Sequence, residues 1–162
     1  MEKLQRRTIS TPFGALVLVG AKDTIEYIQF GVARLPKRYC ETVQEDSKAF
    51  PAAVKQLDEY FAGERTDFTF PIKLEVNGFK KAALLALRRV TYGSTISYKE
   101  LAARAGSENA SRAAGTACAT NPLPIVIPCH RVLKADGSLG GFGGGLDTKR
   151  KLLDLEQAEY RK

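Results

Sequence analysis

The pentapeptide PCHRV at residues 128–132 places the only histidine of the chain beside one of its three cysteines. It follows an apolar run at residues 123–127, so we expect Cys129 to lie at the end of a buried segment. Cysteine attacks as the thiolate, and a free thiol with a pKa of about 8.5 is only a few per cent ionised at neutral pH. A base beside the thiol raises that fraction, so Cys129 and His130 predict nucleophilic cysteine chemistry.

Adjacency in sequence limits direct contact between Cys129 and His130, because neighbouring side chains of an extended strand point to opposite faces. We therefore expect a water to bridge thiol and imidazole, with a carboxylate beyond the ring to fix its tautomer. The sequence leaves four carboxylates open for that role: Asp136, Asp147, Asp154 and Glu156. The alternative is an inert buried cysteine beside a surface histidine, since free cysteine is among the most buried residue types.

Composition narrows the class of protein. The 162 residues suffice for one domain or two small ones, and no disulfide is required for stability. The three cysteines are odd in number and widely spaced, without a CxxC pair, which argues against a structural zinc site and favours a reducing cytosol. The net charge of +7 favours an anionic partner such as nucleic acid. No signal-peptide or membrane-spanning pattern is found, so we expect a soluble intracellular protein.

The first third of the chain predicts a small antiparallel sheet. Short runs rich in Ile, Val, Thr and Tyr predict the strands of a meander at residues 6–10, 16–20 and 24–30. Residues 47–61 have apolar side chains at helical spacing and are closed by Gly63, and we expect this helix to pack across the sheet. An extended linker at residues 66–77 then separates two predicted domains, 1–76 and 77–162.

The second domain predicts a helix at residues 79–90, followed by a helix-turn-helix. Ser97 and Glu100 form a capping-box signature for a short helix, which a glycine ends. Ser107 is expected to cap the next helix, at residues 108–120, which would be the recognition helix.

One face of the predicted recognition helix consists of small residues: Ala110, Ser111, Ala113, Ala114, Gly115, Ala117 and Ala119. Small side chains permit close approach to a DNA groove, and they serve tight packing between helices equally well. Arg112 has a similar ambiguity, because it is either a plain surface arginine or a finger inserted into a base stack.

The glycine run GGFGGG at residues 140–145 is either a flexible connector or a backbone that lies against a flat ligand. It is not a phosphate loop, because it lacks the GxxxxGK[ST] pattern and the strand-to-helix setting of a dinucleotide site. A last helix is predicted to begin at Asp147, with Glu156 near its C-terminal end.

Five segments together resemble the O6-alkylguanine-DNA alkyltransferases, also called methylated-DNA–protein-cysteine methyltransferases. They are ISY at 96–98, SRA at 111–113, NP at 121–122, PCHRV at 128–132 and the glycine run at 140–145. The similarity runs from Tyr92 to Glu156 without an obvious gap and continues more weakly over the N-terminal sheet and helix. The resemblance implies an α+β fold, in which a ribonuclease H-like small antiparallel sheet with a helix precedes a mostly helical winged helix-turn-helix domain.

That family flips an alkylated guanine out of duplex DNA and moves the alkyl group from O6 onto a cysteine, without regenerating the thiol. The resemblance therefore implies a DNA-repair methyltransferase that acts once per molecule, as a suicide enzyme. It also implies double-stranded DNA containing O6-alkylguanine as the partner, a monomeric state, a cytoplasmic or DNA-associated location, no membrane, and no cofactor or metal.

Position by position, the resemblance makes Cys129 the nucleophile and alkyl acceptor, and His130 the base that acts through water. Glu156 matches the carboxylate that orients the imidazole. Asn121 resembles the asparagine that ties the recognition helix to the active-site segment. Tyr98 resembles the tyrosine that donates a proton or a hydrogen bond to the guanine ring.

The resemblance also implies residues for DNA and substrate binding. Arg112 resembles the arginine that enters the stack from the minor groove and fills the space of the flipped base. The implied DNA contacts are Arg112, Ser107, Lys80, Lys81 and Tyr98, with Arg104 as a further phosphate contact. The implied pocket wall consists of Val132, Phe142, Gly143 and Lys149, and Lys149 is also expected to assist Tyr98.

Three positions depart from the family pattern. Leu84 stands where tryptophan is frequent, Phe142 replaces a tyrosine, and Ala119 stands where a basic residue can occur. We expect the first change to affect packing and the second to change the polarity of the pocket, because a hydroxyl is lost while the aromatic face stays.

Two other functions compete with alkyl transfer. One is a damage-binding module of the alkyltransferase-like kind, which lacks the acceptor cysteine, so the presence of Cys129 argues against it. The other is an unrelated cysteine hydrolase, which needs turnover and an oxyanion site, and nothing in the sequence suggests its substrate groove.

Overall fold

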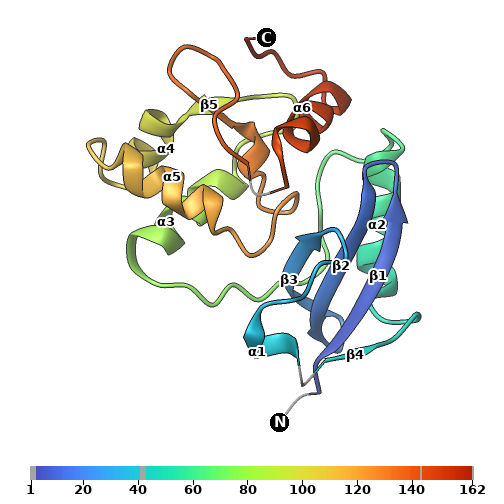
Figure 1. Ribbon diagram of the computed structural model, residues 1–162. Helices are drawn as coiled ribbons and strands as arrows, with labels where there is room; N and C mark the ends of the chain where they lie inside the picture. Colours follow the sequence, from blue (N-terminus) through green and yellow to red (C-terminus); the bar gives the residue numbers. More distant parts are fainter. Residues whose placement is uncertain (1–2, 41–42, 143, 162) are drawn as a thin grey trace. The chain divides into compact units, whose positions relative to one another are not determined.

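The computed structural model describes residues 3–40, 43–142 and 144–161 (Figure 1). The chain divides into two compact units, Met1–Glu75 and Val76–Lys162. This division falls one residue before the boundary that the linker composition predicts.

The N-terminal unit is built on the meander that the sequence predicts, and all three strands are confirmed. Strands β1 (Gln5–Thr11), β2 (Gly14–Ala21) and β3 (Thr24–Phe30) pair antiparallel in chain order. The turn between the first two is closed by Thr11, whose hydroxyl accepts from the Phe13 amide at 3.1 Å and donates to the Gly14 carbonyl at 2.6 Å. A side chain within the turn therefore fixes the register of the hairpin.

Two short elements of this unit are absent from the sequence prediction. Helix α1 (Lys37–Cys40) follows the meander, and strand β4 (Gln44–Glu45) pairs parallel with β1, which gives the sheet order β3-β2-β1-β4. Elements this short contain too few residues for a hydrophobic period to be recognised.

Helix α2 (Pro51–Phe61) begins four residues later than the predicted start at residue 47. The cause is local: Phe50 adopts a left-handed conformation with φ 55°, and Pro51 then occupies the first helical turn, where its missing amide hydrogen costs nothing. The helix lies along one face of the sheet, as predicted (Figure 1), and it buries Ala53, Leu57 and Tyr60.

The C-terminal unit contains four helices in its described part: α3 (Gly78–Arg88), α4 (Tyr98–Arg104), α5 (Ser111–Ala119) and α6 (Leu146–Leu155). Ser97 caps α4 as predicted, because its hydroxyl accepts from the Glu100 amide at 3.0 Å. Ser107 does not cap α5, which is a correction. Its amide donates to the Ala102 carbonyl at 2.9 Å and continues the turn after α4, so α5 begins only at Ser111.

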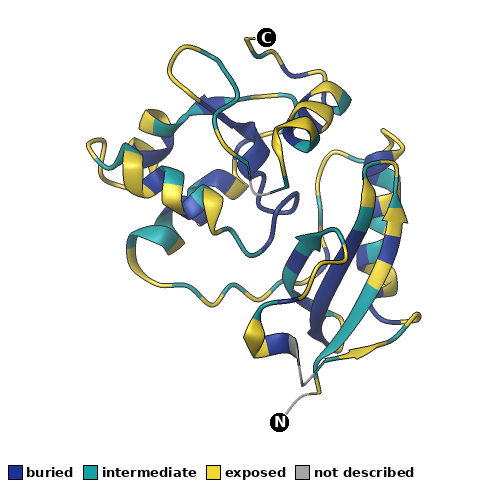
Figure 2. Ribbon diagram, in the orientation of Figure 1, coloured by how far each residue is buried: buried dark blue, intermediate teal, exposed yellow. Residues whose placement is uncertain are grey.

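A two-stranded parallel ladder joins distant parts of this unit. Strand β5 (Ile96–Ser97) pairs with β6 (Val132–Leu133), which places the start of α4 beside the segment that follows the PCHR sequence. Residues Cys129–Arg131 form a 3-10 turn, η1, so the alternation of side chains in an extended strand does not apply to Cys129 and His130. The apolar run before η1 is buried, as predicted (Figure 2).

The mixed α+β class is as the sequence predicts, with a small sheet first and a helical unit second. In the described residues, no helix combines the length and the apolar character needed to cross a lipid bilayer.

Candidate active site

Cys129 lies at the start of η1 with 5% of its surface exposed. Asn121, two residues beyond α5, holds the preceding segment in place. Its amide nitrogen donates to the Ile127 carbonyl at 2.8 Å, and its amide oxygen accepts from the Leu123 amide at 3.0 Å. The side chain thus links the end of the helix to both ends of the apolar run that leads to the cysteine, which is the position expected for Asn121.

His130 and Glu156 form a fully buried pair. Nε2 of the imidazole lies 2.7 Å from Oε2 of Glu156, the residue that caps the C-terminal end of α6. The other ring nitrogen, Nδ1, is buried and has no hydrogen-bond partner among the described residues. A carboxylate accepts from Nε2–H, so Nδ1 carries the free lone pair of the ring.

The structure selects one of the four carboxylates that the sequence left open. Glu156 contacts the imidazole, whereas the others hydrogen-bond or pair with surface neighbours: Asp136 with Ser138, Asp147 with Lys151 and Asp154 with Tyr160. Position 156 is the one that the family resemblance implies.

Arg131 is the functional neighbour that sequence reasoning missed. Its Nε donates to Glu156 Oε1 at 2.8 Å and its Nη2 to Oε2 at 2.9 Å, a bidentate ion pair in which Glu156 is fully buried. Its Nη1 donates to the Val90 carbonyl at 2.6 Å. The sequence feature that could have identified Arg131 is its position between a buried histidine and an apolar strand, because a charged residue there requires a buried partner.

The pKa values of both members of the buried pair are lowered, that of Glu156 against the effect of burial and that of His130 with it. Burial favours the neutral acid, but hydrogen bonds from His130 and Arg131 hold the pKa of Glu156 well below its usual range. Burial, aided by the Arg131 charge, outweighs Glu156 and lowers the pKa of His130. At neutral pH the site therefore holds an ionised Glu156 and an uncharged imidazole.

The Cys129 thiol is protonated in the resting site. Burial raises its pKa, and the opposing effects of the Asn121 hydrogen bond and the Lys149 charge are smaller. Cys129 consequently needs a proton acceptor when it reacts, because the thiolate and not the thiol is the nucleophile.

A pocket of about 760 Å³ opens between α5 and the glycine loop. Its described lining residues are Tyr98, Ser111, Arg112, Gly115, Thr116, Cys118, Ala119, Lys134, Gly140, Gly141 and Phe142. Cys129 is buried and is not part of this lining. It interacts electrostatically with two residues that do line the pocket, Tyr98 and Cys118. The pocket and the nucleophile are therefore neighbours.

Tyr98 is held between the two walls of the pocket. A Cβ atom on Gly140 would lie 2.9 Å from the Tyr98 hydroxyl, and Gly140 also has φ +67°, so this position requires glycine. On the other side, a Cβ atom on Gly115 would touch the ring at 3.9 Å. Burial raises the pKa of Tyr98 to about 12, so its hydroxyl keeps its proton and can donate a hydrogen bond.

Two residues expected in the pocket wall lie elsewhere. Val132 and Lys149 are fully buried and do not line the pocket. Lys149 Nζ donates to the carbonyls of Val132 at 2.7 Å, of Leu139, and of Gly141 at 3.4 Å, so it fastens α6 to the glycine loop. Burial lowers its pKa to about 8.

The other two residues expected in the pocket wall are Phe142 and Gly143. Phe142 lines the pocket as expected, and Gly143 falls outside the described residues.

The residues expected to contact DNA are spread over three elements. Arg112 is exposed in the first turn of α5 and reaches the pocket rim. Ser107 is exposed in the turn before α5, and Lys81 is exposed on α3, while Lys80 is half-buried. Of the small residues of α5, Ala114 and Ala117 are buried in packing, whereas Gly115 and Ala119 line the pocket. Close approach of this helix to a DNA groove stays a prediction.

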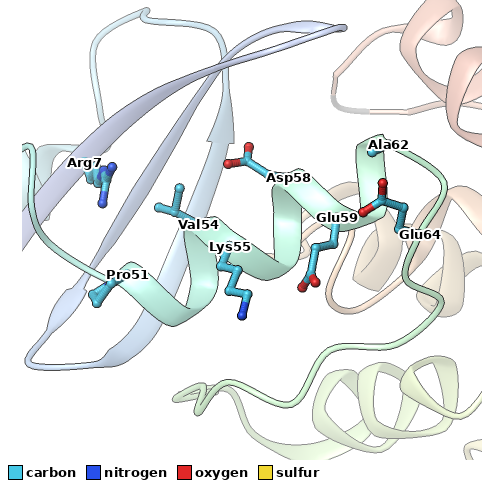
Figure 3. A pocket seen from close by; sticks show the side chains of 8 residues that line it. All are labelled: Arg7, Pro51, Val54, Lys55, Asp58, Glu59, Ala62 and Glu64. Atoms are coloured by element: carbon cyan, nitrogen blue, oxygen red, sulfur yellow. The ribbon is translucent and has the colours of Figure 1, made fainter.

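The N-terminal unit has a second pocket, of about 550 Å³, between α2 and strand β1 (Figure 3). Figure 3 shows Arg7 from the strand beside side chains of α2 that include Lys55, Asp58 and Glu59. Charges of both signs line it and no cysteine or histidine does, so this pocket does not suit cysteine chemistry. In the described residues, no three His, Cys, Asp or Glu side chains group as they would around a metal ion.

Comparison with known proteins accounts for both units. Residues 4–74 match the family model described as "6-O-methylguanine DNA methyltransferase, ribonuclease-like domain", and residues 78–158 match its DNA binding domain. The methylated-DNA–protein-cysteine methyltransferase of Mycolicibacterium paratuberculosis is 41% identical over 95% of this chain and 93% of its own length. That of Methanosarcina acetivorans is 38% identical over 90% and 94%.

The solved structures agree with the sequence comparison. The crystal structure of Mycobacterium tuberculosis OGT in complex with DNA has a TM-score of 0.89 and 39% identity, and it covers 94% of this chain and 92% of that one. A crystal structure of M. tuberculosis O6-methylguanine methyltransferase has a TM-score of 0.88 at 39% identity, and the match covers 95% and 93%. The chain belongs to the 6-O-methylguanine DNA methyltransferase family.

Proposed function

We propose that the protein flips an O6-alkylguanine out of duplex DNA into the pocket beside α5 and transfers the alkyl group to Cys129, once per molecule. As a member of its family, the protein is a methylated-DNA–protein-cysteine methyltransferase and repairs DNA by alkyl transfer. The observation that carries the proposal is the buried Cys129 followed directly by His130, whose imidazole lies 2.7 Å from Glu156.

In the proposed step, the sulfur of Cys129 forms a bond to the alkyl carbon while the bond from that carbon to O6 breaks. The thiol proton passes to Nδ1 of His130 through a water, and the resulting imidazolium is stabilised by Glu156. The buried Nδ1, which has no protein partner in the described part of the chain, supports this route. The product is a thioether, which a base and a water do not cleave, so the molecule is consumed.

The departing guanine needs a donor, and we assign that role to Tyr98. Its hydroxyl lines the pocket and keeps its proton, because burial raises its pKa to about 12. Phe142 supplies an aromatic wall against the base, and Asn121 keeps the helix and the Cys129 segment in register. Lys149 supports the same wall from behind through its bonds to the loop carbonyls.

Duplex DNA is the proposed partner, and the net charge of +7 supports binding to a polyanion. Arg112 at the pocket rim is positioned to fill the space that the flipped base leaves, with further contacts from Ser107, Lys80, Lys81 and Tyr98. We propose a monomer, since the pocket, the nucleophile and the base all come from one unit of one chain. The free thiols Cys118 and Cys129 support a cytoplasmic location.

Mass analysis of the protein after reaction with duplex DNA containing O6-methylguanine tests the proposal. We expect one methyl group on the peptide that contains Cys129, no methyl group in Cys129→Ala, and an unchanged result in Cys40→Ala, a thiol deletion in the other unit. Binding without an adduct would point to a damage-binding module, and repeated release of methanol would point to a hydrolase. Methyl transfer in Cys129→Ala would overturn the proposal.

A further inference from the structure

Two buried side chains and one backbone amide meet at the carboxylate of Glu156. Oε2 of Glu156 lies 2.7 Å from His130 Nε2 and 2.9 Å from Arg131 Nη2, so a single oxygen accepts from both the base and the guanidinium. The second oxygen accepts from Arg131 Nε at 2.8 Å and from the Gly93 amide at 3.3 Å. The catalytic step described above uses His130 and Glu156 but gives no role to Arg131.

We propose that Arg131 is a positioning residue that acts through Glu156 to keep the proton of His130 on Nε2, which leaves Nδ1 free to accept the proton of the Cys129 thiol. This inference rests on the proposed role of His130 as the base. The new element is Arg131, which determines which nitrogen of His130 can accept the thiol proton.

The hydrogen-bond geometry gives the first argument. An ionised carboxylate has only acceptors, so it can face the imidazole only if Nε2 carries a proton. A protonated carboxyl group could instead donate to Nε2, and the neutral ring would then carry its proton on Nδ1. In that tautomer Nδ1 could not accept the proton of the thiol. The bidentate guanidinium satisfies both oxygens and favours the ionised form.

The guanidinium itself is held so that it cannot turn away. Its third donor, Nη1, is bonded to the Val90 carbonyl at 2.6 Å, and its central carbon lies 5.8 Å from the centre of the Tyr92 ring. Anchored on two sides, Arg131 presents a fixed fork to the carboxylate.

The charges that face His130 give the second argument. Glu156 from α6 favours the imidazolium, whereas Arg131 from η1 and Lys149 from α6 oppose it. Cys129 adjoins the ring in sequence and is uncharged at rest, and Tyr92 faces Glu156 and Arg131 as a neutral phenol. Removal of the Arg131 charge leaves burial and Lys149 alone to oppose Glu156, so the imidazolium would persist to higher pH. The base would then be occupied by its own proton over a wider range of pH.

The single histidine makes this proposal directly measurable. In protein labelled with ¹⁵N-histidine, NMR reports the tautomer and the titration of one imidazole, without assignment. We expect the wild type to be neutral at pH 7 with its proton on Nε2. In Arg131→Met we expect the titration midpoint to rise by about one pH unit or more, the usual effect of one nearby charge. The rate with free O6-benzylguanine, which requires no DNA, should fall at low pH with the same midpoint.

Two further variants complete the test. Arg131→Lys keeps the charge but cannot donate to both oxygens, so a smaller rise of the midpoint is expected. If Arg131→Met does not fold, an unchanged midpoint in Arg131→Lys overturns the proposal. Arg150→Met removes an exposed arginine of α6 and should leave the His130 titration as in the wild type.

An unaltered tautomer and midpoint in folded Arg131→Met would show that Arg131 is only structural, even if the rate fell. Failure of the proposed function has a different signature. In that case the wild-type rate would not follow the titration of His130 at all, whatever Arg131 does to the imidazole.

Discussion

Replacement of Glu156 by glutamine perturbs the centre of the site without changing its shape. The wild-type carboxylate accepts from His130 Nε2 at 2.7 Å, from Arg131 at 2.8 and 2.9 Å, and from the Gly93 amide at 3.3 Å. Glutamine keeps one acceptor oxygen and turns the other position into a donor, which faces the donors of His130 and Arg131. Loss of one partner of a buried ion pair costs about 3–5 kcal/mol, a large share of the roughly 5–15 kcal/mol by which domains are stable.

Urea unfolding followed by circular dichroism measures this loss, with Glu159→Gln as the control on an exposed neighbour. The pKa of Glu156 is lowered in the folded protein, so its stabilisation is complete above the unfolded pKa of about 4.3 and declines as the pH falls through the folded pKa. The difference between wild type and Glu156→Gln should therefore be full at pH 7 and should narrow below about pH 4. A loss under about 1 kcal/mol at pH 7, or a pH-independent loss, would show that the ionised Glu156 does not stabilise the fold.

Three further substitutions test base flipping, the support of the glycine loop and phosphate contact. Arg112→Ala should slow repair of duplex DNA by about tenfold or more and leave the reaction with free O6-benzylguanine unchanged, because only the duplex requires base flipping; equal losses would contradict the finger role. Lys149→Met should cost about 2–3 kcal/mol in urea unfolding, because buried carbonyls lose their donor, and a neutral effect would show that the ammonium does not hold the loop. Lys81→Ala should reduce the slope of log K against log salt by about 0.9 in DNA binding, and an unchanged slope would exclude a phosphate contact.

Much of the fold could be predicted because several elements are long enough for the spacing of their apolar side chains to distinguish helix from strand. The strands of the meander and helix α3 follow from apolar spacing over seven or more residues. The start of α2 could not be predicted, because the left-handed Phe50 depends on tertiary packing around a fully buried ring. The start of α5 was misjudged because a serine after a glycine has the composition of a helix cap, whereas Ser107 here closes a turn.

In the site, residues that are recognised by their own type could be predicted, whereas contacts between residues far apart in the sequence could not. Cys129 and His130 follow from their own residue types, since a thiol beside the only imidazole suggests chemistry without any structure. Arg131 was missed because its partner Glu156 lies 25 residues away, and spacing within one element does not show such a pair. The 3-10 turn at residues 129–131 was not predicted, because three residues are too few to show a period.

The central claim is that Cys129 accepts one alkyl group and is then spent. Titration of a fixed amount of protein with an excess of duplex DNA containing O6-methylguanine, followed by counting of repaired lesions and intact-protein mass, tests it most directly. We expect a plateau at one lesion per protein molecule, with a single methyl group on every protein molecule and on no residue other than Cys129. Continued repair beyond one lesion per molecule, or repair that leaves the mass of the protein unchanged, would contradict it.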